Sequence, residues 1–176
     1  MLKTRLKCGM TLMEFLDEHY TPKAEWASVK NSILAKESGK IKPLGITVRK
    51  SLAMETDEFV SICLKLTKYK WFKNYTFSIE FNTEKGYYPH IHILLKKWNK
   101  SELPRCDLIR NLKRIFKQSL DSQIEVKELS SIHANHYEKY LGGDKEDKSK
   151  QDRVQKDIEE RKKFSLDDIY TDLAKN

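Results

Sequence analysis

Hydrophobic and polar residues alternate along four segments of the chain, a pattern typical of strands with one buried face. The alternation is strictest at residues 75–82, where Tyr, Phe or Ile fills every second position. Residues 44–49 and 90–97 alternate in the same way, and residues 124–126 form a shorter fourth segment. The turn-like residues 83–86 join two of these segments, which predicts an antiparallel hairpin.

Hydrophobic residues at helical spacing predict helices between and after these strands. Residues 55–70 and 108–120 each carry a hydrophobic stripe that could cover one face of a sheet. A third helix is predicted over residues 131–141, from a serine cap to the terminating pair Gly142-Gly143. The fold class is therefore α+β: a ferredoxin-like or RNA-recognition-motif-like βαββαβ antiparallel sheet, with a tyrosine-bearing helix after the last strand.

The chain divides by composition into three parts. Residues 1–42 predict an N-terminal extension of two helices, the second of which starts at Thr21-Pro22. Residues 43–143 contain the predicted strands and form the main domain. Residues 144–176 begin with a run of eight basic and seven acidic residues, which predicts a charged tail or a solvated helix.

The distribution of charge adds a partner class. The 176 residues carry a net charge of +8, to which residues 144–163 contribute +1 and residues 164–176 contribute −2. The remaining +9 lies on residues 1–143, which should attract a polyanion such as nucleic acid. The sequence has no apolar run of about 18 residues, so we expect a cytoplasmic protein without a membrane partner. Its three cysteines lack Cys-x-x-Cys spacing, which indicates reduced structural cysteines.

Two histidines stand two residues apart on a predicted strand. Both imidazoles of His90 and His92 therefore leave the same face and can converge on one metal ion. If strand 75–82 pairs with strand 90–97, Glu80 can share that face and supply a carboxylate. Two imidazoles and one carboxylate would make a three-ligand site with open positions. A plain polar strand face is the alternative interpretation of the same spacing.

Two tyrosines three residues apart, Tyr137 and Tyr140, lie near one another on the predicted helix 131–141. Tyrosine can act as a covalent nucleophile, although a lone helical tyrosine usually serves packing. His133 and His136 lie on the same helix. They could help to activate a tyrosine or bind phosphate, or they could simply occupy the helix surface.

Taken together, these motifs resemble an HUH endonuclease, whose name describes its His-hydrophobic-His pair. The resemblance covers residues 43–143 and rests on Phe77-Ser-Ile-Glu-Phe81, Gly86-Tyr-Tyr-Pro-His-Ile-His-Ile-Leu-Leu95 and Tyr137-Glu-Lys-Tyr-Leu141. The chain is similar in particular to rolling-circle replication initiators of plasmids, phages and single-stranded DNA viruses, in which the histidine pair precedes the tyrosine helix. Residues 45–48 fall where that family has its first motif.

The resemblance implies metal-dependent, site-specific nicking and joining of single-stranded DNA. His90 and His92 would ligate Mn²⁺ or Mg²⁺ with Glu80 as third ligand. Tyr140 would attack the DNA and form a 5′-phosphotyrosine, because the family often writes its nucleophile as Lys-Tyr; Tyr137 is the alternative. Many members also have a lysine three or four residues after the tyrosine, where this chain has Gly143 and Asp144.

The implied partners are single-stranded DNA at a replication origin and a separate helicase, since the sequence has no Gly-x-x-x-x-Gly-Lys-Ser/Thr loop of its own. Three other functions compete with this interpretation. A single-tyrosine HUH transposase would use the same residues, and a non-haem iron oxygenase could use the two histidines and the carboxylate. A non-catalytic nucleic-acid-binding module would instead stack bases on strand aromatics, but here these alternate with Glu80 and fall on the opposite face.

Overall fold

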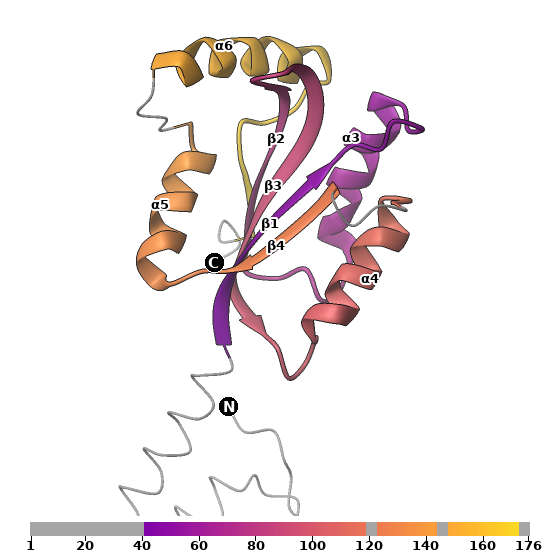
Figure 1. The fold of residues 1–176 in the computed structure, drawn as a ribbon, viewed down its shortest axis with the longest axis vertical. Coiled ribbons are helices and arrows are strands. Elements are labelled where there is room, and N and C mark those ends of the chain that lie inside the picture. Colours follow the sequence, from indigo (N-terminus) through magenta and orange to yellow (C-terminus); the bar gives the residue numbers. More distant parts are fainter. Residues whose placement is uncertain (1–40, 119–122, 144–147, 173–176) are drawn as a thin grey trace, which may run out of the picture. The chain divides into compact units, whose positions relative to one another are not determined.

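The computed structural model describes residues 41–118, 123–143 and 148–172. The two helices predicted within residues 1–40 lie outside this part. The described residues form an α+β structure with a five-stranded antiparallel sheet and four α-helices, compatible with a ferredoxin-like fold (Figure 1). The predicted α+β class and antiparallel sheet are therefore confirmed.

Five strands form the sheet in the spatial order β4-β1-β3-β2-β5, and each neighbouring pair is antiparallel. Their bounds are Ile41–Arg49 (β1), Tyr75–Thr83 (β2), Gly86–Asn99 (β3), Ile124–Glu128 (β4) and Tyr170–Thr171 (β5). The predicted hairpin is present as β2 and β3. Its short turn closes at Gly86, whose φ of 109° is accessible to glycine at little cost.

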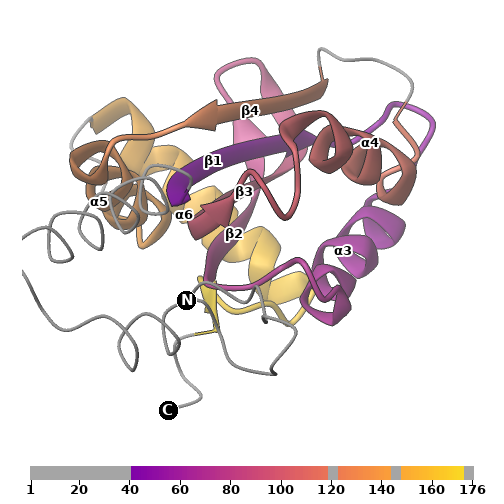
Figure 2. The same ribbon diagram turned by 90° about the horizontal axis from the view of Figure 1, so that it is seen from below.

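Helices cover both faces of the sheet, with α3 and α4 on one side and α5 and α6 on the other (Figures 1 and 2). Their bounds are Thr56–Lys65 (α3), Arg105–Ile115 (α4), Ser131–Leu141 (α5) and Lys148–Lys163 (α6). Helix α5 begins after Ser130, whose hydroxyl accepts a hydrogen bond from the His133 N–H. In the described part of the chain, no helix has the length and hydrophobicity needed to cross a bilayer.

The larger hydrophobic core lies between the sheet and helices α3 and α4. The alternating residues of β1, β2 and β3 supply its floor. The buried residues of α3 and α4 above it are Phe59, Val60, Cys63, Leu108 and Leu112. Burial of each large aliphatic or aromatic side chain contributes roughly 1.5–3 kcal/mol. This core therefore fixes which face of each strand points away from it.

A smaller cluster holds α5 against the other face. Leu94 of β3 packs with Ala134 and Leu141 of α5. Gly45 of β1 lies beneath the helix: a Cβ atom there would be at an ordinary contact distance of 3.6 Å from Tyr137 Cε1 and would crowd Leu129 Cδ1 at 3.1 Å. Helix α5 is thus held at a distance at which its tyrosines reach the sheet.

The segment after residue 147 packs on the sheet and adds a strand to it. Helix α6 packs on β2, and β5 pairs with the same strand. Asp157 is 1% exposed, and its Oδ1 accepts hydrogen bonds from the N–H groups of Phe81 (2.8 Å) and Asn82 (2.9 Å). The Phe164 ring stacks on Phe81 with centroids 5.3 Å apart. The charged composition of the segment gave no sign of this buried carboxylate.

We expect Asp157→Ala to lower the free energy of unfolding by about 2–4 kcal/mol, because it leaves buried donors without their acceptor. Urea denaturation followed by circular dichroism measures the loss. Asp152→Ala, on an exposed position of the same helix, is the control and should change the value by less than about 0.5 kcal/mol. Equal effects of the two substitutions would show that α6 does not depend on this contact.

Candidate metal centre and tyrosine pair

The register of the hairpin brings the three predicted metal ligands together. Glu80 of β2 lies directly opposite His90 of β3, and His92 follows on the same face. Glu80 Oε2 is 3.6 Å from His90 Nε2 and 3.9 Å from His92 Nε2. One ligand atom from each residue lies within 4.8 Å of the others. The three side chains could therefore hold one metal ion.

The hydrogen bond of His90 favours the tautomer that a metal requires. Its Nδ1 lies 2.9 Å from the carbonyl oxygen of Tyr88, which can only accept, so Nδ1 is the protonated nitrogen. The lone pair on Nε2 then points toward Glu80. A proton or a metal ion between this nearly buried carboxylate and the lone pair would stabilise both groups.

A second pair of contacts orients His92. Its Nδ1 is 3.0 Å from Thr47 Oγ1 and 3.1 Å from the Tyr137 hydroxyl. Thr47 lies opposite His92 in the β1–β3 pairing, and the Tyr137 hydroxyl also donates to the Ile46 carbonyl at 3.5 Å. These contacts turn Nε2 toward Glu80, as hydrogen-bonded partners of metal-ligating histidines do.

Sequence reasoning did not identify Thr47. Its polar position in the alternating segment 44–49 was the available signal. That signal becomes informative only when β1 is known to pair with β3.

The two tyrosines of α5 lie over the same sheet face. Their rings stack with an interplanar angle of 3° and centroids 6.2 Å apart, and each meets the His92 ring edge to face. Burial raises the pKa of Tyr137 well above its usual value, against a hydrogen bond from Thr47 that lowers it. Burial also raises the pKa of Tyr140 to about 12; the charge of Glu80 adds to this and that of Arg153 opposes it. Both phenols are therefore protonated at neutral pH unless a further cation acts on them.

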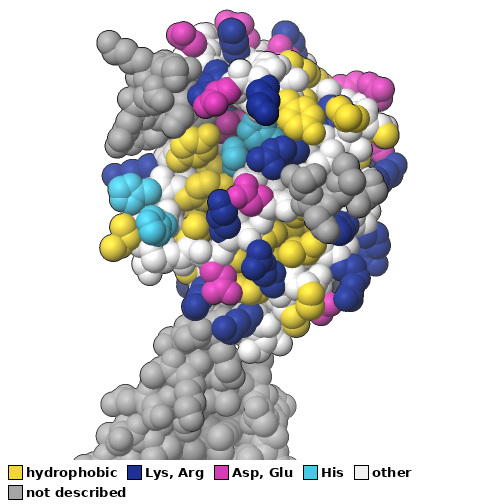
Figure 3. All heavy atoms as spheres, viewed as in Figure 1, with side chains coloured by type: hydrophobic (Ala, Val, Ile, Leu, Met, Phe, Trp, Pro, Cys, Tyr) yellow, Lys and Arg dark blue, Asp and Glu magenta, His cyan; other side chains and the backbone are white. Residues whose placement is uncertain are grey.

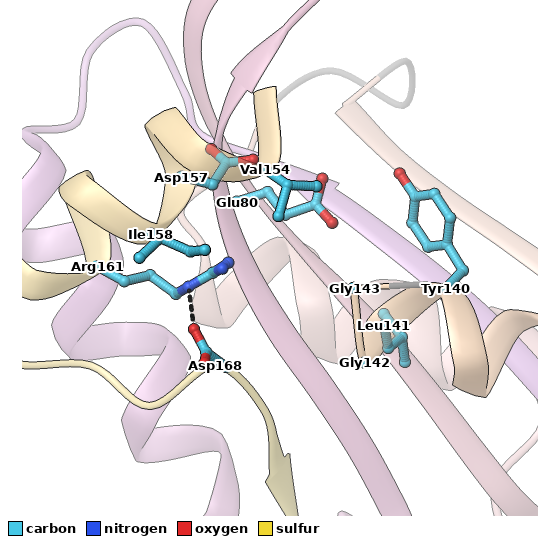
Figure 4. Close-up of a pocket in the computed structure, with 10 residues that line it drawn as sticks. All are labelled: Glu80, Tyr140, Leu141, Gly142, Gly143, Val154, Asp157, Ile158, Arg161 and Asp168. Carbon is cyan, nitrogen blue, oxygen red and sulfur yellow. Dashed lines mark hydrogen bonds and ion pairs between the residues drawn. The ribbon is translucent and has the colours of Figure 1, made fainter. Parts of the chain in front are cut away.

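Tyr140 differs from Tyr137 in facing a cavity. A hollow of about 190 Å³ is lined by Glu80 of β2, by Tyr140 and Gly143, and by Asp157 and Arg161 of α6. In Figure 4 the Glu80 carboxylate points toward the side of the cavity where Tyr140 stands. Tyr140 is thus accessible from the cavity, whereas the Tyr137 hydroxyl is bonded to the sheet.

The other predicted candidates on α5 lie elsewhere. His133 and His136 are exposed, and His133 Nδ1 lies 3.0 Å from the hydroxyl of the capping Ser130. Among the described residues, the cluster of possible metal ligands contains neither of them. Their position is that of helix-surface residues.

No family model matches the chain, and no curated protein or solved structure does either. A function must therefore be argued from the chemistry of the site. The site offers three convergent ligand atoms, two tyrosines over one of those ligands, and a cavity beside them.

We expect Mn²⁺ to raise the melting temperature of the protein, because an ion bound only by the folded state stabilises it, by about 2.7 kcal/mol at one hundred times Kd. The His90→Ala/His92→Ala double variant should lose this shift. Thermal denaturation with and without Mn²⁺ measures it. The matched control is His133→Ala/His136→Ala, which removes two exposed histidines and should keep the shift; if both double variants kept it, the ion would bind elsewhere.

Proposed function

We propose that the protein is a metal-dependent HUH endonuclease that nicks and rejoins single-stranded DNA through a covalent tyrosine intermediate and so initiates rolling-circle replication. The observation that carries the proposal is that Tyr137 and Tyr140 lie over the sheet face that presents Glu80, His90 and His92. A metal site alone fits many reactions. A metal site with a tyrosine at a cavity beside it fits transfer of a phosphate to a phenol.

The donor set suits a divalent ion, and the Nδ1 contact of His90 leaves its Nε2 available as a ligand. Mn²⁺ or Mg²⁺ held by Glu80, His90 and His92 would polarise the scissile phosphate and offset its developing charge. Thr47 and Tyr137 keep the His92 ring in the orientation that this requires. In this proposal Tyr137 is a positioning residue.

Tyr140 is the proposed nucleophile because it faces the cavity. Its phenolic oxygen forms a bond to phosphorus while the bond from phosphorus to the 3′ oxygen of the preceding nucleotide breaks. The phenol loses its proton and the leaving 3′ oxygen gains one, which leaves a 5′-phosphotyrosine and a free 3′-hydroxyl. Because the new link is again a phosphodiester, a 3′-hydroxyl can reverse the step, and joining needs no ATP.

The arrangement of elements supports the proposed fold family as well. The chain order β1, α3, β2, β3, α4, β4 and the sheet order β4-β1-β3-β2 support a ferredoxin-like βαββαβ core. We propose that the substrate is single-stranded DNA at a replication origin, opened by a separate helicase in the cytoplasm. The competing base-stacking module is less well supported, because Phe77 and Phe81 are fully buried.

With Mn²⁺ and a pool of single-stranded DNA 40-mers of random sequence, we expect a protein–DNA adduct that survives denaturation and that contains only the small fraction of oligonucleotides carrying the nicking site. Tyr140→Phe should remove the adduct and lower the cleavage rate by at least about a thousandfold, since it removes the attacking oxygen. Tyr137→Phe should keep the adduct at a lower rate. Denaturing gels and mass spectrometry of the digested adduct report the amount and the residue.

Two results would contradict this. Nucleotide attached to Tyr137 would exchange the roles of the tyrosines. Metal-dependent cleavage without any adduct would make the protein a hydrolytic nuclease that activates water.

A further inference from the structure

A second hollow, here called the hairpin groove, lies at the turn between β2 and β3. It encloses about 720 Å³, and its lining includes Arg49, Glu84, Lys85, Tyr87, Tyr88 and Arg153. These residues come from β1, from the hairpin and from α6, so only the folded chain brings them together. Figure 3 shows one face of the molecule, on which histidine side chains lie at the surface with basic and hydrophobic side chains next to them.

The hairpin groove adjoins the metal centre. Arg49 lies opposite His90 in the β1–β3 pairing, and the carbonyl of Tyr88 accepts the hydrogen bond that orients His90. If one phosphate of a nucleic acid bound at Glu80, His90 and His92, the neighbouring nucleotides would therefore lie in the groove.

The charges of the groove suit a polyanion. The lining contains three cationic side chains, those of Arg49, Lys85 and Arg153, and one carboxylate, that of Glu84. Arg153 is 3.5 Å from Glu84, and Arg49 is 4.0 Å from Glu125. Ion pairs this long near the surface contribute little, so a phosphate could compete with these carboxylates for the two arginines.

Tyr87 supplies a flat surface for a base. The residue is 52% exposed, and its ring lies against that of the buried Phe81, with centroids 6.2 Å apart and an interplanar angle of 27°. A tyrosine held in this way costs little conformational entropy when it stacks. Aromatic rings among cations bind unpaired bases of any sequence, because every base has a π face.

We propose that the hairpin groove binds the nucleotides of single-stranded DNA that flank the scissile phosphate, with a base stacked on Tyr87 and phosphates near Arg49, Lys85 and Arg153. The proposal rests on the function proposed above, since it takes the metal centre as the place of the scissile phosphate. It explains how a small domain could hold its substrate without reading the sequence at these positions.

Fluorescence anisotropy with labelled oligothymidylate (dT20) tests the groove in the full chain carrying Tyr140→Phe, so that binding is measured without cleavage. In that background Tyr87→Ala should weaken binding by about tenfold or more, and Tyr87→Phe should restore it. Lys85→Ala should reduce the slope of log affinity against log salt by about 0.7. Tyr69→Ala/Lys73→Ala, an exposed aromatic and cationic pair near the opposite end of the hairpin, is the matched control and should bind as the parent does.

The outcomes separate the two proposals. Parental affinity in Tyr87→Ala, with adduct formation by the wild-type protein, would overturn the groove and leave the nuclease standing. Groove-dependent binding of dT20 without any cleavage by the wild-type protein would support the groove and overturn the nuclease. Equal affinity for a 20-base-pair duplex would contradict base stacking, and tighter groove-dependent binding of oligouridylate (U20) would overturn the choice of DNA in favour of RNA.

Discussion

The register of the β2–β3 hairpin is the constraint on which the candidate site depends. Side chains alternate along a strand, so a slip of one residue would move Glu80 to the face covered by α3 and α4 and bring a hydrophobic residue to the histidines. Phe77 and Ile79 oppose that slip, because both are fully buried on the core face. The hydrophobic core therefore sets the chemistry of the opposite face, although it contributes no atom to it.

Electrostatics then defines what the site can hold. Glu80 and His90 are 5% and 7% exposed, and a carboxylate this deeply buried is costly without a compensating cation. The contacts of His90 to Tyr88 and of His92 to Thr47 and Tyr137 direct both Nε2 atoms toward the carboxylate. The same geometry places the two tyrosines in different surroundings. Tyr137 is bonded to the sheet, while Tyr140 is left facing the cavity.

Helix α6 connects the site with its surroundings. Asp157 anchors the helix to β2 through main-chain hydrogen bonds, and Arg161 donates to the Ile79 carbonyl and pairs with Asp168. The face that carries these residues also closes the cavity beside Tyr140, and Arg153, one turn before Asp157, lines the hairpin groove. One helix of mostly charged residues thus contributes to both hollows and is itself held to β2 by buried ionic groups.

The sequence by itself determined strands β1 to β4, their faces and the grouping of Glu80, His90 and His92, because alternation and a short turn are local properties. It did not predict β5, which lies in the charged segment 144–176. Spacing along one helix also placed Tyr137 beside Tyr140. The tertiary structure decided the rest: Thr47 reaches His92 across 45 residues of sequence, and Asp157 reaches Phe81 across 76. Pairings of this kind depend on how the whole core packs, so no local pattern specifies them. Which of the two tyrosines lies at the cavity was likewise decided by the tertiary structure. It follows from how α5 and α6 dock on the sheet, and the spacing along α5 alone does not specify it.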